Sequence, residues 1–310
     1  MQFMSVITNI RYWIISGLLL GLLIGDIGSY APYILTVFLI VMMCISLEGI
    51  DFKTNDFVNN RKKILMALVC CYVISPLVTL GIGMFYSDDL WIGWVLIASV
   101  PCAVSVVSST LILRGDTKLA LLSVTAVYLL AIIITPSMTY LLLGNAINPV
   151  QILKYVVLFI VIPMLVSIPL RRIHMTQNTK SVSLNFCFFI MVFIAFGTNR
   201  EYFVYEPVMI LTVLAGCFVR IVLIHISFET IFRLMGIDRE TRIVYVLHCI
   251  WKNTGLAMTL ALLLMPDLTE AAIPGAVSLP FELIYFMAMI WFYDKRVPPS
   301  ESVVKRIAGS

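Results

Sequence analysis

Charged residues are scarce in this sequence. Asp, Glu, Lys and Arg make up only 12% of its 310 residues, whereas a soluble globular domain carries about 25%. No polar stretch is longer than about 20 residues, which excludes a large soluble domain and a disordered chain. Apolar residues make up 61% of the chain, and the mean hydropathy is +1.02. The composition therefore predicts an integral protein of the lipid bilayer. Its net charge of +4 is spread between apolar runs, which does not favour nucleic acid as a partner.

Motifs of catalysis are absent as well. The sequence has no nucleophile elbow, Walker loop, HExxH segment or dinucleotide fingerprint, so we expect neither an enzyme nor ATP-driven transport within this chain. Its seven cysteines form no CxxC pair and all lie inside apolar segments. We interpret them as free packing thiols, and we expect no metal site and no cofactor.

Ten stretches are long and apolar enough to cross a bilayer core of about 30 Å, which takes about 20 helical residues. They lie at about 11–26, 30–50, 62–86, 90–113, 117–143, 150–170, 183–199, 207–232, 241–265 and 270–293. They are apolar all round, which favours helices over the alternating strands of a membrane barrel. No small-residue cleavage site follows the first stretch, so we expect it to be retained as a span.

Lysine and arginine are distributed unequally between the two sides of these spans. The side of the N-terminus holds 17 of the 21 Lys and Arg residues, and the other side holds only Lys154 and Arg200. Cytoplasmic loops retain positive charge. The first side, called the basic side below, is therefore predicted to be cytoplasmic together with both termini, in a multi-pass protein of the plasma membrane. The opposite loops, called the acidic side, are acidic or neutral.

An odd number of spans in each half inverts the second half relative to the first. Five spans precede the neutral loop near Gly144–Pro149 and five follow it. Residues 1–146 and 147–310 are thus predicted to be inverted five-helix repeats, an all-α architecture typical of secondary transporters with a substrate site between interrupted helices. Ten spans without a repeat are the alternative on these counts alone.

Polar residues interrupt the fourth and ninth spans, each the fourth span of its half. A helix break in hydrocarbon frees backbone groups, so it survives only where it lines a cavity or a partner helix. The candidates for substrate or ion binding are Pro101, Ser105, Ser108 and Ser109 in the fourth span and His248, Lys252, Asn253 and Thr254 in the ninth. Hydroxyl back-bonding around a kink is the structural alternative for the fourth span. That alternative is weaker for the ninth, because a lysine at the bilayer centre costs about 2.5–3.5 kcal/mol.

Further ionisable residues lie within the eighth and tenth spans. Arg220 keeps its charge, so we expect it to face the interior and to pair with Glu229, Glu282 or backbone carbonyls. Such a pair is a structural ion pair or a substrate contact, and Arg220 and Glu282 join the candidate site. We interpret His225 as a packed, hydrogen-bonded histidine. Glu229 lies near the end of its span, from where its side chain is expected to reach the interface.

Two segments resemble the bile acid:sodium symporter family. Residues 101–136, PCAVSVVSSTLILRGD followed by TKLALLSVTAVYLLAIIITP, are similar to that family's fourth span, its exit and the Ser/Thr-rich span after it. Residues 251–276, WKNTGLAMTLALLLMPDLTEAAIPGA, are similar to its MQNSGLA segment, acidic turn and small-residue tenth span. The resemblance implies a core of spans 3–5 and 8–10, a panel of spans 1, 2, 6 and 7, and helices that cross at their breaks.

The same resemblance implies that organic anions, such as bile acids or small carboxylates, are carried together with sodium ions. The family's sodium ligands are replaced here by Val106, Val107, Ala120, Val124, His248 and Lys252. Valine offers no oxygen to a sodium ion, and a lysine ammonium supplies permanent positive charge where relatives hold a cation. We therefore expect sodium coupling to be lost.

The leading hypothesis is a secondary transporter of a small organic anion that works by alternating access. Lys252, the Asn253–Thr254 pair and the helix N-termini at the breaks would attract a carboxylate. Transport would be coupled to protons through His248, or uncoupled. The alternatives are a sodium-coupled symporter with a remodelled site and a non-transporting membrane sensor built on the carrier fold.

The layout also resembles the arsenite exporter family, which carries a Cys and a Glu in its interrupted helices. Cys102 lies next to Pro101, near the position of that Cys. The Glu falls near Gly255, which has no side chain, so an arsenite-type exporter ranks below organic-anion transport.

Overall fold

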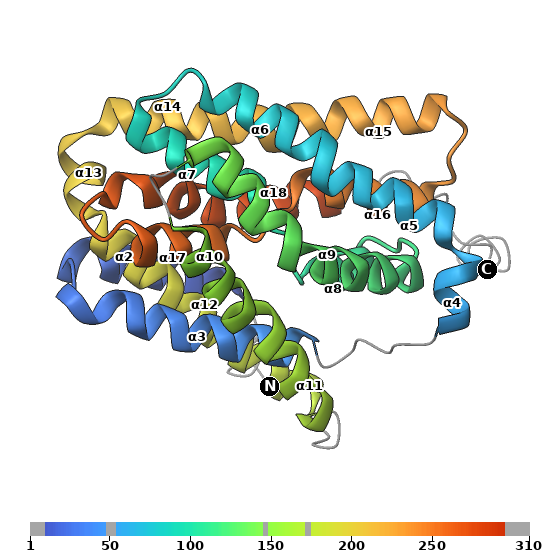
Figure 1. Ribbon diagram of the computed structural model, residues 1–310, viewed down its shortest axis with the longest axis horizontal. Helices are drawn as coiled ribbons and strands as arrows, with labels where there is room; N and C mark the ends of the chain where they lie inside the picture. Colours follow the sequence, from blue (N-terminus) through green and yellow to red (C-terminus); the bar gives the residue numbers. More distant parts are fainter. Residues whose placement is uncertain (1–9, 48–53, 145–147, 171–174, 295–310) are drawn as a thin grey trace, which may run out of the picture.

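A computed structural model describes residues 10–47, 54–144, 148–170 and 175–294 of the chain. Both termini and the expected repeat boundary at 146–147 lie outside these ranges. Within them the protein is helical and contains no β-strand, and most helices run along the longest axis of the molecule (Figure 1).

The helices follow one another through short connections. The described part of the first half contains α2 (Ile10–Ile24), the 3-10 turn η1 (Gly28–Tyr30), α3 (Ala31–Leu47), α4 (Thr54–Asn59), α5 (Arg61–Val69), the π-helical turn η2 (Cys70–Ile74), α6 (Ser75–Gly83), α7 (Asp88–Ser99), α8 (Val106–Ile112) and α9 (Thr117–Leu143). The second half contains α10 (Pro149–Val156), the π-helical turn η4 (Val157–Val161), α11 (Ile162–Leu170), α12 (Gln177–Thr198), α13 (Arg200–Tyr205), α14 (Pro207–Phe218), the π-helical turn η5 (Val219–Leu223), α15 (Ile224–Leu234), α16 (Arg239–Ile250), α17 (Thr254–Leu264), the 3-10 turn η6 (Thr269–Ala272) and α18 (Ile273–Asp294).

Seven helical segments of the described chain are long and apolar enough to cross a membrane. They are Gly28–Ser46, Arg61–Gly83, Thr117–Leu143, Val150–Leu170, Asn178–Thr198, Pro207–Leu234 and Thr269–Tyr293. These segments overlap the second, third, fifth, sixth, seventh, eighth and tenth stretches expected from the sequence. Together they make the chain a multi-pass membrane protein.

The seventh stretch begins earlier than expected. Apolarity alone placed its start at 183, whereas α12 begins at Gln177. The Thr176 side chain accepts a hydrogen bond of 3.2 Å from the Thr179 amide, and this cap allows a polar first turn. The short helices α4 and α13 were not expected, because neither is long enough or apolar enough to stand out.

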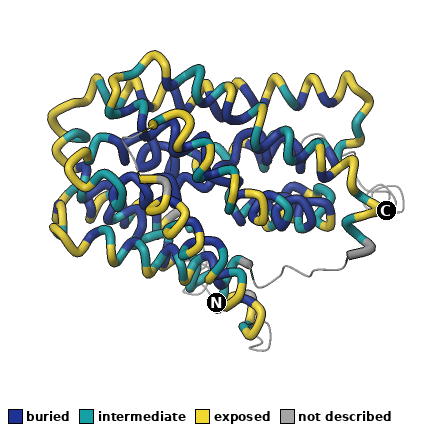
Figure 2. The backbone as a smooth tube through the Cα atoms, viewed as in Figure 1, coloured by how far each residue is buried: buried dark blue, intermediate teal, exposed yellow. Residues whose placement is uncertain are grey.

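Large apolar side chains cover much of the outer surface, as a protein surrounded by lipid requires. Leu141 is 80% exposed, and Leu23 and Val208 are each 73% exposed. Figure 2 shows exposed positions along the outer helices and buried positions in the interior, around α7, α16 and α17.

Glycines let α2 pack closely along α12. A Cβ atom added to Gly21 would lie 2.6 Å from the Phe193 carbonyl oxygen, and one added to Gly197 would lie 2.6 Å from the Gly25 carbonyl oxygen. Backbones can approach so closely only where side chains are absent. Because α3 packs against both α12 and α11, these four helices form one layer, at the lower left of Figure 1.

Candidate functional site

Two expected helix interruptions are present and lie side by side. Non-helical segments at 100–105 and 251–253, called the fourth-span break and the ninth-span break below, separate α7 from α8 and α16 from α17. Cys102 and Lys252, at the centres of the two breaks, face each other as an isolated antiparallel pair. The interruptions expected from the sequence are thereby confirmed.

Backbone hydrogen bonds join the two breaks directly. The Ala103 amide donates to the Trp251 carbonyl at 3.0 Å, and the Asn253 amide donates to the Pro101 carbonyl at 2.9 Å. Each break therefore satisfies polar groups that the other leaves free, which is the condition for non-helical backbone at membrane depth.

The Lys252 ammonium points away from the breaks and toward the helical segment Arg61–Gly83, which consists of α5, η2 and α6. Its Nζ atom donates a hydrogen bond of 3.0 Å to the Cys71 carbonyl and lies 5.5 Å from the centroid of the Tyr72 ring. The side chain is only 1% exposed. The ammonium is thus a buried cation with one hydrogen-bonded oxygen and one aromatic face.

The local sequence explains why the Cys71 carbonyl is available. In the π-helical turn η2 the Ser75 amide donates to the Cys70 carbonyl, one residue further back than in an α-helix. The same i→i+5 spacing would give the Cys71 carbonyl the amide of Pro76, but proline has no N–H. The Cys71 carbonyl therefore needs a donor from elsewhere, and Lys252 provides it.

Asn253 closes the start of α17. Its Oδ1 atom accepts from the Leu256 amide at 3.1 Å, as a helix N-cap does. Its Nδ2 atom donates to the Tyr128 hydroxyl at 3.2 Å and lies 3.6 Å from the Met43 sulfur. Asn253 therefore ties the ninth-span break to α9 and α3.

Arg220 and Glu282 form a buried ion pair beside the ninth-span break. Arg220 Nη2 lies 2.6 Å from Glu282 Oε1, and Nη1 donates to the Ile250 carbonyl at 3.1 Å. The other carboxylate oxygen, Oε2, accepts from the Thr254 hydroxyl at 3.1 Å. The cation thus lies at the C-terminus of α16 and the anion near the N-terminus of α17, which complements both helix dipoles. The expected pairing of Arg220 with Glu282 and a carbonyl is confirmed.

The expectation for Glu229 is wrong, and that for His225 is confirmed. Glu229 is buried, accepting from Arg242 Nε at 3.2 Å and from the Tyr293 hydroxyl at 3.0 Å, because these partners make burial favourable. His225 is buried with Nδ1 2.6 Å from the Tyr285 hydroxyl and Nε2 3.2 Å from the Tyr293 hydroxyl.

His248 lies inside the protein, one helical turn before Lys252. Its Nδ1 atom is 2.8 Å from the Val244 carbonyl oxygen, and Nε2 is buried with no hydrogen-bond partner among the described residues. No group of three or more His, Cys, Asp or Glu that could hold a metal ion occurs in the described ranges.

A cavity of about 620 Å³, called the crossover cavity below, extends from the breaks toward the basic side. Ser105, Ser108, Ser109, Lys252, Asn253, Thr254 and Glu282 line it, seven of the ten candidate residues, whereas Pro101, His248 and Arg220 do not. Most other lining side chains are apolar, including Met42, Leu184, Phe188, Leu279 and Phe286. Lys180 and Thr117, at the basic-side ends of α12 and α9, lie at its far end.

The serines of the fourth span differ in their bonding. Ser108 donates back to the Ser105 carbonyl at 3.0 Å, in the manner of the structural alternative. Ser105 and Ser109 make no side-chain hydrogen bond within the described residues, so their hydroxyls are available toward the cavity.

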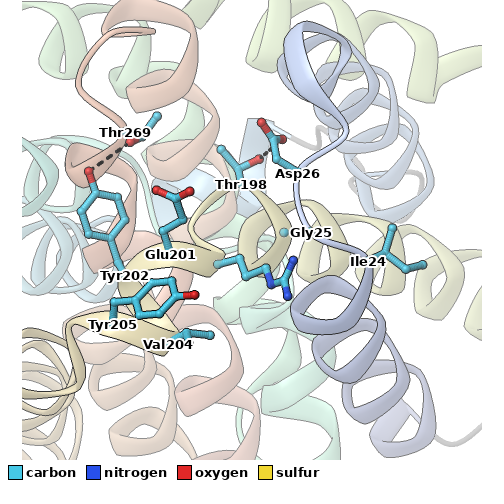
Figure 3. A pocket seen from close by; sticks show the side chains of 11 residues that line it. Ile24, Gly25, Asp26, Thr198, Glu201, Tyr202, Val204, Tyr205 and Thr269 are labelled. Carbon is cyan, nitrogen blue, oxygen red and sulfur yellow. Dashed lines mark hydrogen bonds between the residues drawn. The ribbon is translucent and has the colours of Figure 1, made fainter.

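A second pocket, of about 470 Å³, lies at the acidic side (Figure 3). There the Thr198 hydroxyl donates to Asp26 Oδ1 at 3.2 Å, and the Tyr202 and Thr269 hydroxyls are 3.4 Å apart. The second contact joins α13 to η6. None of the ten candidate residues lines this pocket.

Asp238 caps α16, the helix that carries His248. Its Oδ1 atom accepts from the Thr241 amide at 2.8 Å. Burial raises the pKa of the Asp238 carboxyl, but hydrogen bonds from Thr241 and the charge of Lys63 outweigh this effect and leave the pKa below its usual value. A lowered pKa means that the cap stabilises the protein above about pH 4 and that this contribution is lost as the pH falls.

Removing this cap should have a modest effect on stability. Asp238→Ala is expected to destabilise the protein by about 1 kcal/mol, because the Thr241 amide loses its acceptor. Asp238→Asn keeps a side-chain oxygen and should melt within about half a degree of wild type, whereas the alanine variant should melt about 1–2 °C lower. Thermal unfolding of the purified variants checks this, and equal melting of the alanine and asparagine variants would contradict it.

The sequence is similar to known transporters. Residues 36–206 match the family described as the Sodium Bile acid symporter family. The uncharacterized sodium-dependent transporter YocS of Bacillus subtilis (strain 168) is 22% identical over 177 residues, which are 55% of this chain and 54% of that protein. The match thus spans about half the length of this relative.

Proposed function

The chain belongs to the sodium bile acid symporter family, and on that basis we propose that it is a secondary transporter that carries a small organic anion by alternating access, without sodium. The observation that carries this proposal is the Lys252 ammonium, held on the Cys71 carbonyl beside the crossing breaks. A fixed cation at this point gives permanently the charge that a bound sodium ion would give only when present.

The charges around the crossover cavity favour an anion. The Arg220 and Glu282 charges cancel within their ion pair, which leaves the buried positive charge of Lys252. In a medium of low dielectric this charge attracts an anion more strongly than it would in water. The N-terminal end of α17 adds a partial positive charge on the same cavity. The apolar remainder of the lining suits an organic ion.

We further propose ten spans in two inverted repeats, 1–146 and 147–310. The seven long helical segments account for seven spans, and the two broken runs α7–α8 and α16–α17 are too short in their parts to count singly. The tenth is α2, whose apolar part Tyr12–Ile24 is short. Two features support the repeat: a break in the fourth span of each half and a π-helical turn, η2 or η5, in the third. The layer of α2, α3, α11 and α12 corresponds to the panel.

This topology predicts opposite sidedness for two added cysteines. Ser87→Cys, between α6 and α7, should react with a membrane-impermeant thiol reagent added outside the cell. Ser302→Cys, which lies beyond the described residues, should react with this reagent only after the membrane has been permeabilised. All seven native cysteines are buried and should not react with the reagent, so the wild-type protein is the control. Labelling of both variants from one side would show that the span count is wrong.

Sodium independence is the test of the proposed function. Uptake of carboxylates graded in size from pyruvate to cholate into proteoliposomes should change less than about twofold when potassium replaces sodium, because Val106, Val107 and Val124 offer sodium no side-chain oxygen. A thermal-shift series with the same anions measures binding without transport. A sensor would bind an anion without moving it.

Sodium-coupled symport is the second candidate, and the name of the Bacillus relative favours it. In that case backbone carbonyls of the breaks would have to hold the ion. A clear rise in anion affinity with sodium, at constant ionic strength, would establish this second candidate and refute the first.

A further inference from the structure

A ladder of polar contacts joins α14, η5 and α15 to α18. Its rungs are Cys217 with Ser278 at 3.1 Å, Arg220 with Glu282 at 2.6 Å, His225 with Tyr285 at 2.6 Å and with Tyr293 at 3.2 Å, and Glu229 with Tyr293 at 3.0 Å. The ladder runs from the level of the ninth-span break toward the basic side. The proposed function uses only its Arg220–Glu282 rung.

The π-helical turn brings this ladder into register. Arg220 and His225 are five residues apart, and in an α-helix they would point in different directions. Between them lies η5, whose i→i+5 spacing places such residues on the same face. On α18 the partners Glu282, Tyr285 and Tyr293 follow at helical spacings and share one face. The insertion in the helix therefore aligns the two sets of polar groups.

The hydrogen bonds of the lower rungs all point the same way. Glu229 can only accept while it is ionised, so the Tyr293 hydroxyl donates to it. The Tyr293 oxygen is then the acceptor for His225 Nε2–H, and His225 Nδ1 is left to accept from the Tyr285 hydroxyl. A neutral His225 with its proton on Nε2 therefore completes a chain of donors directed from Tyr285 to Glu229.

Burial of these groups is more than packing requires. His225 is 1% exposed and Glu229 is 2% exposed, and both lie in the helical segment Pro207–Leu234, which is apolar enough to cross a membrane. Apolar pairs would hold α15 to α18 at no electrostatic cost. Ionisable side chains inside a membrane commonly mark paths for protons or ions.

We propose that Tyr285, His225, Tyr293 and Glu229 form a proton-transfer chain, and, resting on the proposed function, that the ion coupled to anion transport is a proton. A proton arriving at the Tyr285 oxygen releases the Tyr285 proton to His225 Nδ1. The Nε2 proton moves to the Tyr293 oxygen, and the Tyr293 proton moves to Glu229 Oε2. Each group gains one proton and gives one up except Glu229, which keeps the one transferred.

Both ends of this chain lie at suitable places. Tyr285 is one helical turn from Glu282, which lines the crossover cavity. Glu229 is held by Arg242, whose side chain is 13% exposed at the basic side. Tyr285 itself does not line the crossover cavity, so the proposed chain runs from one helical turn beyond the cavity wall toward the basic side. It moves the proton role from His248, whose Nε2 has no partner among the described residues, to His225.

The described charged and titratable groups around His225 come from three helices, α15, α16 and α18. Tyr285 and Tyr293 face it from α18, and Phe292 packs on its ring. Glu229 lies one turn away on α15. From α16, Arg242 reaches Glu229, and Arg239 stacks on the Tyr293 ring at 5.7 Å.

Proton exchange at the buried imidazole tests the chain without any substrate. Full-length protein in lipid nanodiscs, with ¹⁵N-labelled histidine rings and His225→Gln for assignment, should show a neutral ring protonated on Nε2 near neutral pH. That proton should exchange with bulk water although the ring is buried. Tyr293→Phe should slow the exchange at least about tenfold, because one link is lost.

Two further variants keep this test decisive. Glu229→Gln retains an acceptor for Tyr293 but cannot take up a proton, so it should slow exchange without loosening the fold. Tyr86→Phe is the control, because the Tyr86 hydroxyl is not part of the proposed proton-transfer chain and donates to the Thr212 carbonyl at 2.6 Å. Its loss should leave the exchange rate of the His225 proton unchanged. Equal exchange rates in wild type, Tyr293→Phe and Glu229→Gln overturn the proposed chain.

Coupling is tested separately in proteoliposomes that contain a pH-sensitive dye, with pyruvate and cholate as probe anions. Anion uptake by wild type should move protons in the same direction, and Glu229→Gln should lose this proton movement while it still exchanges anion for anion. Anion uptake without proton movement in wild type overturns the coupling. Failure of every probe anion to cross overturns the proposed function, and the exchange measurement still decides the chain.

Discussion

Arg220→Met should destabilise the protein by about 3–5 kcal/mol, because Glu282 would remain buried without its cation. The Ile250 carbonyl at the end of α16 would also lose its donor. The expected result is a sharply lower melting temperature in detergent and a low yield of folded protein. Thermal unfolding followed by size-exclusion chromatography measures both.

The double variant Arg220→Met with Glu282→Leu distinguishes two costs. One is the cost of leaving Glu282 buried without its cation, and the other is the cost of losing the ion pair itself. An apolar pair of similar volume often replaces a buried ion pair without loss, so the double variant should recover most of the stability. It should not bind anions normally, because the Thr254 hydroxyl loses its acceptor at the cavity wall. If Arg220→Met alone melts like wild type, the pair has no structural role.

Lys252→Gln should weaken anion binding by about 30-fold. For an assumed separation of about 8 Å between the ammonium and the carboxylate, a unit charge contributes about 2 kcal/mol at an effective dielectric constant of about 20. The substitution removes this charge but leaves an amide that can donate toward the Cys71 carbonyl. Binding of whichever carboxylate gives the largest thermal shift in wild type provides the measurement.

Lys63→Gln is the matched control for this charge. It also removes one lysine from the basic side, where Nζ donates to the Thr241 hydroxyl at 3.2 Å, but it lies away from the crossover cavity. Its anion affinity should stay within about twofold of wild type, since a distant exposed charge is screened. Wild-type affinity in Lys252→Gln would mean that the lysine only replaces a structural cation and that the anion is held elsewhere.

Most of the helical layout follows from apolarity and the positions of Lys and Arg. The stretch expected at 117–143 coincides with α9, and the breaks followed from Pro101 and from Lys252 at mid-span. Polar helix starts escape such reasoning. The first turn of α12 is polar and depends on the Thr176 cap, so apolarity placed its start too late.

Partners of the buried polar groups could not be predicted from the sequence. The Tyr285 and Tyr293 hydroxyls lie 60 and 68 residues from His225, and only the packing of α15 on α18 brings them together. The acceptor for Lys252, the Cys71 carbonyl, could be predicted only weakly from the sequence. A proline five residues after Cys71 frees this carbonyl only if the helix widens into a π turn. The local sequence does not predict that widening.

The two hydrogen bonds between the breaks use backbone atoms alone, from Ala103 to Trp251 and from Asn253 to Pro101. Mutation cannot easily remove them, since every amino acid brings the same carbonyl and all but proline bring the same amide. A gene that encodes this crossing can therefore change the side chains around it one codon at a time while the crossing itself is inherited intact. Such substitutions would allow one ancestral fold to give rise to carriers whose transport is coupled to different ions.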